Sequence, residues 1–358
     1  MVAGTRHAGG PVPAGRHPGP GGPPSTDAGG RGDGTSSEGS GFGMSVSRMA
    51  AARLAGEAPG DLLAGTSAPE SALFLAIWAH HDRAPDTALA AARLAVELDP
   101  DGEFARLLAL YLGSGHTRGD RVYDTPAAFQ AFIRGGGNVG LYSATQEALR
   151  RHYHRFDAPT VLDVGVGDGM ALLPVLDAGL SRVDVVEPSA ELLARTRAGL
   201  AESGVPHRVR HARIEDVQRE WDGERWTVVQ STFAFDALPP DRRSGVLEWI
   251  RDRCESFLLV VFDVPDTTRP FSPEWFLPVL AKAEQGVREY TEHRDLVGLG
   301  FLVPVVLGFF DAGSARANYE QSVPSWEAEL RSAGFGTVSS HRLFDYWWQP
   351  AYVIEASR

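Results

Sequence analysis

Cysteine and lysine are almost missing from this chain of 358 residues. Cys254 is the one cysteine, so the chain cannot form an internal disulfide or a cysteine-rich zinc or iron–sulfur site. Lys282 is the one lysine among 34 basic residues, which sets aside most Schiff-base and P-loop chemistry. A lone thiol fits a reducing compartment, and we expect a cytoplasmic protein.

Long apolar runs are missing as well. The longest candidate, residues 301–310, is too short for a membrane span and contains Pro304. The N-terminal stretch lacks the continuous apolar segment of a signal peptide. The net charge of −12 argues against a broad grip on nucleic acid or on an anionic membrane. We therefore expect a small-molecule partner, with no nucleic acid and no membrane; a homodimer is compatible with the sequence.

The N-terminus has little that could form a core. Residues 1–44 hold 14 Gly and 6 Pro, and Phe42 is their only aromatic residue. Such a segment buries too little apolar surface to offset its chain entropy, so we predict a disordered tail over 1–45. Translation from Met44 or Met49 is an equal alternative, in which case this stretch is not part of the protein.

A helical region follows over residues 46–120. Its three Ala-rich amphipathic segments, separated by Pro and Gly breakers, lie at 71–82, 87–98 and 104–112. We predict a small helical lid. The phrase 88–100 resembles the second helix of a tetratricopeptide unit, but no repeat follows it, and one unit cannot stack on itself.

From residue 121 onward, β-rich runs alternate with helical patterns. The predicted strands lie near 160–165, 182–187, 207–212, 226–231, 257–264, 336–344 and 351–356. The predicted helices lie near 170–178, 190–203, 241–252 and 324–333. This alternation predicts an α/β fold with a doubly wound, mostly parallel sheet over 121–358.

Two segments beside these strands are candidates for the walls of a ligand pocket. A capping-box pattern, Ser143 to Gln146, predicts a helix start in the arm before the first strand. The connection over 265–323 is about 60 residues long and rich in aromatic residues, and insertions of this length tend to be lids or binding elements.

A glycine-rich turn follows the first predicted strand. The segment Val161 to Gly169 reads Val-Leu-Asp-Val-Gly-Val-Gly-Asp-Gly, with Gly165 and Gly167 before the last glycine. Such glycines let the backbone approach a ligand closely, and a helix starting there would point free N–H groups at it. The spacing departs from the G-x-G-x-x-G pattern of dinucleotide sites, because position 170 is Met170.

An acidic residue ends the next strand. Glu187 lies 18 positions after Gly169, and a carboxylate at this place can accept both ribose hydroxyls of a nucleoside. The order of these segments resembles class I S-adenosylmethionine-dependent methyltransferases: residues 163–169 match the first motif of that family, and Glu187 with Pro188 matches the second. The resemblance covers about residues 120–358 and implies a Rossmann-like sheet of seven strands, with the last strand antiparallel between its neighbours.

The same resemblance implies S-adenosyl-L-methionine as the cofactor and indicates which residues contact it. Asp216, with Glu215 as the alternative, stands where the family places a side chain beside the adenine amino group. The segment after the fourth strand corresponds to the motif that passes the methionine part of the cofactor. The candidate cofactor-binding residues are Asp163, Gly165, Gly167, Gly169, Glu187, Pro188, Glu215, Asp216, Ser231, Thr232 and Phe233.

Catalytic demands on the protein are modest. Methyl transfer is an in-line displacement at a sulfonium, so the enzyme mainly aligns the acceptor and excludes water. A general base helps only a nucleophile that keeps its proton. The first candidate base is His293 in the long insertion, with His341 and Asp236 behind it, and Tyr142 is a candidate on the arm. We expect no metal site, because Lys282 lacks the carboxylate set that metal-assisted catechol-type enzymes use.

These inferences predict a methyltransferase that acts on O, N or C of a small, apolar, aromatic or polyketide-like acceptor in specialised metabolism. One alternative keeps the cofactor but catalyses another reaction, such as cyclisation or decarboxylation. A second alternative is a non-catalytic module whose helices, over 68–113, recruit a partner. An exposed apolar stripe on those helices would favour this second alternative.

Overall fold

The computed structural model describes residues 44–115, 126–177, 179–266, 269–310 and 318–358. The predicted tail over 1–45 therefore lies outside the described residues, apart from its last two positions. None of the helices in the described ranges has the length and apolar character that a membrane span requires.

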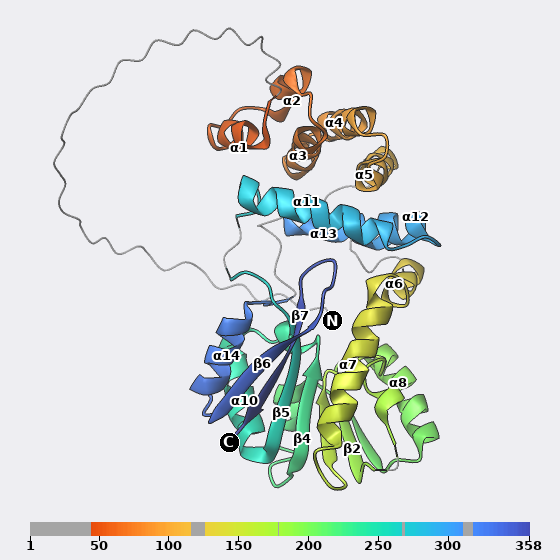
Figure 1. Cartoon of the computed structure of the whole chain (residues 1–358), viewed down its shortest axis with the longest axis vertical. Helices are drawn as coiled ribbons and strands as arrows, with labels where there is room; N and C mark the ends of the chain where they lie inside the picture. The colour runs from red at the N-terminus through yellow and green to blue at the C-terminus, as the bar shows by residue number, and fades with distance from the viewer. Residues whose placement is uncertain (1–43, 116–125, 178, 267–268, 311–317) are drawn as a thin grey trace, which may run out of the picture. The chain divides into compact units, whose positions relative to one another are not determined.

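A seven-stranded sheet forms the centre of the C-terminal part (Figure 1). Its strands are β1 (Thr160–Val164), β2 (Arg182–Glu187), β3 (His207–His211), β4 (Trp226–Thr232), β5 (Cys254–Phe262), β6 (Thr337–Phe344) and β7 (Ala351–Ser357). The spatial order is β3-β2-β1-β4-β5-β7-β6; the pairs from β3 to β5 are parallel, and β7 runs antiparallel between β5 and β6. The predicted fold class, with its inserted antiparallel strand, is confirmed. The carboxyl ends of the parallel strands share one edge, where ligands of such sheets bind.

Helices cover both faces of this sheet (Figure 1). On one face lie α7 (Gly137–Tyr153) and α8 (Ala190–Ser203), and on the other lie α10 (Pro240–Arg253) and α14 (Val323–Ser332). The central strands are buried on both faces, which explains why they read as nearly continuous apolar runs rather than as an alternating pattern.

The helix predicted over 170–178 is wrong. After Gly169 the chain makes turns and one short 3₁₀ segment, η2 (Leu173–Val175). Pro174 supplies the reason, because in a helix starting at Met170 its ring would clash with the carbonyl one turn earlier and its missing N–H would break a hydrogen bond. The glycine turn therefore has no full helix behind it.

The arm before β1 begins its helix earlier than predicted. α7 starts at Gly137, so Ser143 lies inside the helix as an exposed residue and not at its cap. The preceding glycines are explained by packing: a Cβ on Gly136 would lie 2.7 Å from the Tyr290 ring. The Gly137 N–H donates to Glu289 Oε2 at 2.9 Å. The glycine run thus lets the arm approach the insertion closely.

The N-terminal helices share one core with the insertion. They are α1 (Val46–Leu54), α2 (Pro59–Leu62), α3 (Pro69–His81), α4 (Pro85–Leu98) and α5 (Glu103–Gly113), and the insertion contributes α11 (Pro273–Arg288), α12 (Arg294–Val297) and α13 (Val303–Phe309). Glu284 of α11 accepts the N–H groups of Glu103 and Phe104, at 3.1 and 2.8 Å, and so caps α5 from another segment. The three predicted helices are present; the division into domains at 45 and 120, with an insertion over 265–323, stays a prediction.

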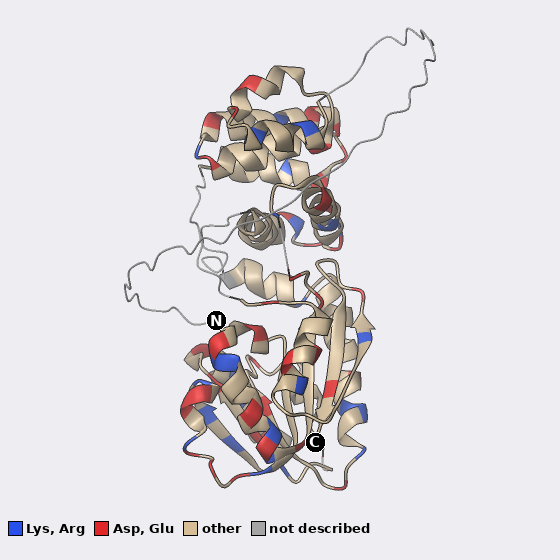
Figure 2. Ribbon diagram, turned by 90° about the vertical axis from the view of Figure 1, so that its left-hand side faces the viewer, with Lys and Arg blue, Asp and Glu red and all other residues tan. Residues whose placement is uncertain are grey.

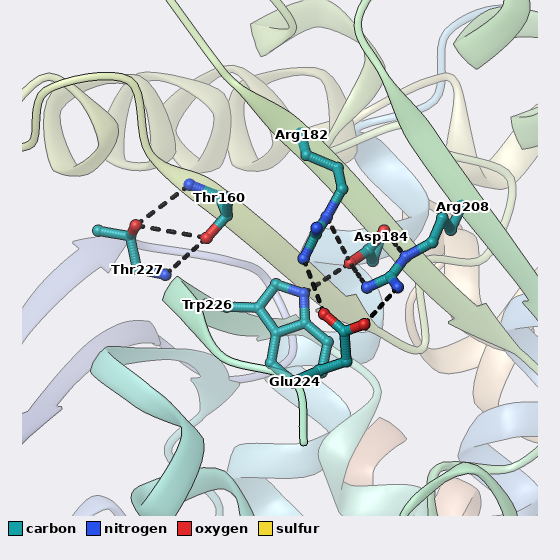
Figure 3. A network of polar contacts seen from close by, with 7 residues as sticks. All are labelled: Thr160, Arg182, Asp184, Arg208, Glu224, Trp226 and Thr227. Atoms are coloured by element: carbon teal, nitrogen blue, oxygen red, sulfur yellow. Dashed lines mark hydrogen bonds and ion pairs between the residues drawn. The ribbon is translucent and has the colours of Figure 1, made fainter. Parts of the chain in front are cut away.

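A polar network around the buried Asp184 joins β2, β3 and β4 (Figure 3). Asp184 is fully buried and accepts hydrogen bonds from Arg182 Nε at 3.1 Å, from Arg208 Nη2 at 2.7 Å and from Trp226 Nε1 at 2.7 Å. Glu224 bonds both arginines, at 3.3 and 2.7 Å. These carboxylates raise the pKa of Arg208 further above its usual range. The buried charge is therefore fully compensated, which is the condition under which a fold tolerates one.

His152 fastens α7 to the sheet. The residue is only 2% exposed, and its Nε2 lies 3.0 Å from Ser256 Oγ on β5 while its Nδ1 lies 3.2 Å from Arg155 Nη1. Since arginine can only donate, Nδ1 accepts and Nε2 carries the proton, so the ring is neutral. Burial above all, and Arg155 next to it, lower the pKa of His152 to about 4 against the opposing effect of Glu355.

This histidine predicts a specific loss of stability in acid. Below about pH 6.5 this histidine is protonated in the unfolded chain, whereas in the folded protein it stays neutral down to about pH 4. The free energy of unfolding should therefore fall by about 2–3 kcal/mol between pH 6.5 and 4 from this residue alone. Urea unfolding at pH 7, 6, 5 and 4 measures it. His152→Gln should show a shallower decline, and His154→Gln, which changes an exposed neighbour, should follow the unmodified protein. Equal slopes in all three proteins would contradict the assignment.

Candidate cofactor and acceptor site

The glycine turn after β1 lies at the carboxyl edge of the sheet. Gly165, Gly167 and Gly169 have φ of +76°, +59° and +83°, where residues with a Cβ are strained. A Cβ on Gly165 would lie 2.5 Å from that of Ala234, and a Cβ on Gly169 would lie 2.7 Å from Leu173. A Cβ on Gly167 would meet nothing within 4 Å. Packing thus requires two of the glycines, and the middle one faces open space.

Glu187 reaches from the end of β2 back to this turn. The residue is 4% exposed, and its Oε2 accepts the Gly167 N–H at 2.9 Å while its Oε1 accepts the Ser189 N–H at 2.7 Å. The carbonyl of Pro188 accepts from His211 Nε2 at 3.0 Å, which ties the same segment to the end of β3. The structure therefore brings together the glycine turn and the carboxylate that the sequence predicted as one site.

Asp163 stands on β1 beneath the turn and is fully buried. Its Oδ2 accepts from Gln230 Nε2 at 2.8 Å, whereas its Oδ1 is buried with no hydrogen-bond partner among the described residues. Burial, and then the nearby Glu187, raise the pKa of Asp163 to about 7, while the Gln230 hydrogen bond opposes this. An unpaired carboxylate oxygen in the interior is costly, so this position is suited to a ligand that brings a donor.

The two acidic candidates after β3 differ in burial. Both lie on the short helix α9 (Ile214–Val217), where Asp216 is exposed. Glu215 is half-buried, its Oε2 is buried with no partner in the described segments, and its Oε1 lies 3.9 Å from Arg242 Nη1. The geometry thus favours Glu215, the alternative, as the inward-facing acid, and its contact with adenine stays a prediction.

The end of β4 holds the three candidates of the fourth motif. Ser231 is fully buried, and its hydroxyl donates to the carbonyl of Val164 at 2.8 Å, so its side chain links β4 to β1. Thr232, half-buried, is the last residue of the strand. Phe233 follows with φ of +52°, a strained value for a residue of this size, and such strain concentrates at functional sites.

Aromatic rings continue from this point along the carboxyl edge. Tyr142 of α7 meets Phe233 edge to face at 6.1 Å, Phe233 stacks on Phe262 at 4.8 Å, and Phe262 stacks on Tyr346 at 5.3 Å between centroids. Burial first, and then Asp168 in the glycine turn, raise the pKa of the Tyr142 hydroxyl. Tyr142 therefore stays protonated at neutral pH and can act as a donor or a wall, and its catalytic role stays a prediction.

The remaining candidate bases lie in different places. His293 is exposed and caps α12 with φ of +61°, and no described contact joins it to the glycine turn. His341 is exposed on β6 and borders a cavity of about 130 Å³ together with His152 and Glu355. Asp236 lies in η3 (Phe235–Ala237), three residues after Phe233, and burial raises its pKa. Of these bases only Asp236 adjoins the site, so the structure offers no support for His293.

Asn138 ties the arm to the other segments of the carboxyl edge. Its Nδ2 donates to the Phe132 carbonyl at 3.0 Å and to the Tyr290 hydroxyl at 3.1 Å, and its Oδ1 accepts from the Tyr346 hydroxyl at 3.0 Å. The arm, the insertion and the β6–β7 loop are thus fixed to one another, as expected for segments that together build an acceptor pocket.

Sequence reasoning missed Gln230 and Tyr153. Gln230 is fully buried on β4, and its Oε1 accepts a hydrogen bond from the Tyr153 hydroxyl of α7. Gln230 could have been noticed in the sequence, because it is a long polar side chain within an otherwise apolar central strand. In the described part of the chain, no group of three or more His, Cys, Asp or Glu side chains is placed to hold a metal ion.

The comparisons with known proteins gave one match to a family model and several solved structures of low similarity. Residues 161–255 match the family model described as "Methyltransferase domain", while no curated protein matches the chain. Among solved structures, magnesium protoporphyrin IX methyltransferase from Synechocystis PCC 6803 with bound SAM is 11% identical, with 66% of this chain and 92% of that chain covered and a TM-score of 0.42. The N-terminal domain of EvdMO1 with SAH bound is 13% identical, with 60% and 80% covered and a TM-score of 0.38. The methyltransferase domain of a bacterial Hen1 is 12% identical, with 61% and 100% covered and a TM-score of 0.41.

The matched segment runs from β1 to the start of β5 and includes the glycine turn, Glu187 and both acids of α9. Residues 161–255 therefore form a methyltransferase domain, and a domain of this class implies S-adenosylmethionine as the cofactor. The resemblance drawn from the motifs, the enzyme class and the cofactor are confirmed.

Proposed function

We propose that this protein transfers the methyl group of S-adenosylmethionine to O, N or C of a small organic acceptor in specialised metabolism. The observation that carries the proposal is the pair of buried carboxylates beside an open glycine: Glu187 holds Gly167, and Asp163 has an unpaired oxygen. Among the described residues, the Asp163 carboxylate has one hydrogen-bond partner, the neutral amide of Gln230. A buried anionic pair of this kind favours a cationic ligand, and the cofactor carries a sulfonium and an ammonium group.

The residues present fit this cofactor. Glu187 retains free lone pairs that can accept ribose hydroxyls, and the open side of Gly167 leaves room for a nucleoside against the backbone. Glu215 presents a buried, unpaired oxygen toward which an amino group can donate. When bound, the cofactor supplies an electrophilic methyl group. The protein's part is to orient the acceptor along the line of displacement and to exclude water.

The aromatic residues at the carboxyl edge favour an apolar or aromatic acceptor. Tyr142, Phe233 and Phe262 are partly buried, and each ring contacts the next. Tyr142 also interacts with Asp168, so this row of rings borders the glycine turn. Rings so placed can stack on a planar acceptor. Asp236 is the nearest candidate for a proton acceptor, and its raised pKa suits that role better than an ordinary surface carboxylate would.

A polyanionic acceptor is disfavoured by charge. The chain carries 46 acidic and 34 basic residues, and acidic and basic positions intermingle on the helices beside the sheet in Figure 2. Such a surface gives no broad attraction for a nucleic-acid backbone. The small-molecule acceptor of the proposal is consistent with this distribution.

The alternative of a non-catalytic recruiting module loses its main support. An exposed apolar stripe on the N-terminal helices would favour it, but the apolar side chains of α3, such as Phe74, Ile77 and Trp78, are at most 1% exposed. They pack into the core shared with the insertion. A reaction other than methylation on the same cofactor remains the second candidate.

Two measurements test the proposal. Isothermal titration with S-adenosylmethionine should show binding in the micromolar range or tighter, and its absence would end the proposal. Incubation with methyl-labelled cofactor and pooled aromatic and polyketide-like acceptors, followed by mass spectrometry, should show a labelled acceptor and S-adenosylhomocysteine. Acceptor conversion with unaltered cofactor would instead establish the non-methylating alternative.

The open side of Gly167 leads to a further prediction. Gly167→Ala should weaken S-adenosylmethionine binding at least tenfold, because the new methyl group occupies the space that the cofactor needs. Its cost in stability should be about 1 kcal/mol, from the positive φ alone. Gly204→Ala is a matched control, since Gly204 also has a positive φ, +73°, with nothing within 4 Å of its Cβ position. Similar binding by both variants would show that Gly167 does not face the cofactor.

A further inference from the structure

A chain of three buried side chains runs from α7 through β4 to β1 beneath the glycine turn. The Tyr153 hydroxyl donates to Gln230 Oε1, and Gln230 Nε2 donates to Asp163 Oδ2 at 2.8 Å. Asp163 and Gln230 are fully buried, and Tyr153 is 3% exposed. Because the Tyr153 hydroxyl donates to the amide oxygen, the amide nitrogen is turned toward the carboxylate.

The surroundings of Asp163 otherwise oppose its charge. From β2 it faces the carboxylate of Glu187, from α7 it faces the phenol of Tyr153, and from β4 it faces the neutral amide of Gln230. Among the described residues, Gln230 is the one hydrogen-bond partner of the Asp163 carboxylate. Its amide favours the ionised form, whereas burial and Glu187 both disfavour it.

We propose that Gln230, oriented by Tyr153, is a positioning residue that favours the ionised form of Asp163 and leaves its Oδ1 free for the amino-acid end of the cofactor, and that cofactor binding is therefore coupled to pH. This inference rests on the proposed function. The ammonium group of the cofactor supplies both the donor that Oδ1 lacks and the positive charge that the two carboxylates lack. Protonation of Asp163 removes this attraction, so acid weakens binding.

The burial of Asp163 sets the range in which this coupling acts. Its pKa is raised to about 7, so the carboxyl group changes its charge near neutral pH. Affinity should then rise as the pH increases through about 7, because only the ionised form pairs with the ammonium group. Below this value each pH unit is worth up to tenfold in affinity.

The experiment is a titration of the full-length protein with S-adenosylmethionine by calorimetry at several values between pH 5 and 7, which lie below the ordinary pKa of an α-amino group. We expect the dissociation constant to increase about tenfold or more from pH 7 to 5. The same titration with 5′-methylthioadenosine, which lacks the amino-acid part, should give a flat curve. A flat curve with S-adenosylmethionine, or equal slopes for both ligands, would overturn the inference.

Variants separate positioning from a purely structural role. Gln230→Met should shift the curve toward higher pH by about one unit, which is roughly a five- to tenfold weaker affinity at pH 7. Asp163→Asn should bind weakly with no pH dependence. Gln285→Met, which changes an exposed glutamine of α11, should leave the curve in place. A Gln230→Met curve that coincides with the unmodified protein would contradict the proposal.

A milder change keeps the test available if Gln230→Met does not fold. Tyr153→Phe removes one hydroxyl and should shift the curve in the same direction by a smaller amount; no shift would contradict the orienting role of Tyr153. Absence of S-adenosylmethionine binding at every pH would instead refute the proposed function, so the two failures are distinguishable.

Discussion

Replacing Glu187 by alanine should weaken S-adenosylmethionine binding by about 2–3 kcal/mol, or roughly 30- to 160-fold. The carboxylate is buried against the glycine turn and supplies the acceptors that ribose hydroxyls need. Its removal also leaves the N–H groups of Gly167 and Ser189 without their acceptor, which loosens the turn itself. Both effects reduce affinity in the same direction.

Isothermal titration measures this loss, and thermal unfolding checks that the variant is folded. Glu191→Ala is the matched control: Glu191 lies four residues further on, at the start of α8, with its side chain 80% exposed. That control should bind the cofactor as the unmodified protein does. Glu187→Gln, which keeps the shape but not the charge, should fall between the two. An unchanged dissociation constant for Glu187→Ala would remove the basis of the proposed function.

Replacing Asp184 by alanine should lower the free energy of unfolding by about 3–5 kcal/mol. The residue is fully buried and accepts from two arginines and from Trp226 Nε1 (Figure 3). Without it the arginines face each other with only Glu224 between them, and the buried indole N–H loses its acceptor. Removing one partner from a compensated buried charge costs far more than removing an exposed ion pair.

Urea unfolding followed by circular dichroism measures this difference. Glu220→Ala is the control, because Glu220 is 61% exposed and pairs with Arg210 at 3.2 Å, a surface ion pair that should contribute less than 1 kcal/mol. Asp184→Asn should lose less than Asp184→Ala, since its amide oxygen still accepts one hydrogen bond. If Asp184→Ala and Glu220→Ala lost similar amounts, the network would not stabilise the fold as the structure indicates.

The strands could be predicted because their signal is local. Short runs of β-branched residues bounded by Gly, Pro and polar clusters gave the seven strands to within a few residues. The helix over 170–178 could not be excluded by its apolar pattern, because Pro174 acts through a clash one turn back along the chain. The start of α7 could not be predicted for a different reason. The glycines at this start allow close contacts with the Glu289 carboxylate and the Tyr290 ring, which lie far away in sequence.

The residues of the candidate site likewise fall into those that the sequence predicted and those that only the structure revealed. The glycine turn and Glu187 were found because β1 and β2 are parallel neighbours, so that a turn and a strand end close in sequence also meet in space. Gln230 and Tyr153 were missed, because their roles exist only where α7 packs on β4 above Asp163. His293 was chosen for its residue type within an aromatic insertion, and its exposed position at the start of α12 gives that choice no support.

By itself the sequence determined the positions of the strands and of the glycine turn, because these are short-range features of the chain, while the class, the strand order and the cofactor followed from the resemblance of its motifs to class I methyltransferases. Only the tertiary structure decided which polar atoms are buried without partners, which acid of α9 faces inward and how the arm is fixed to the insertion. These properties depend on which distant segments exclude water from one another, and that is settled by packing, since burial of a side chain is a property of its neighbours in space.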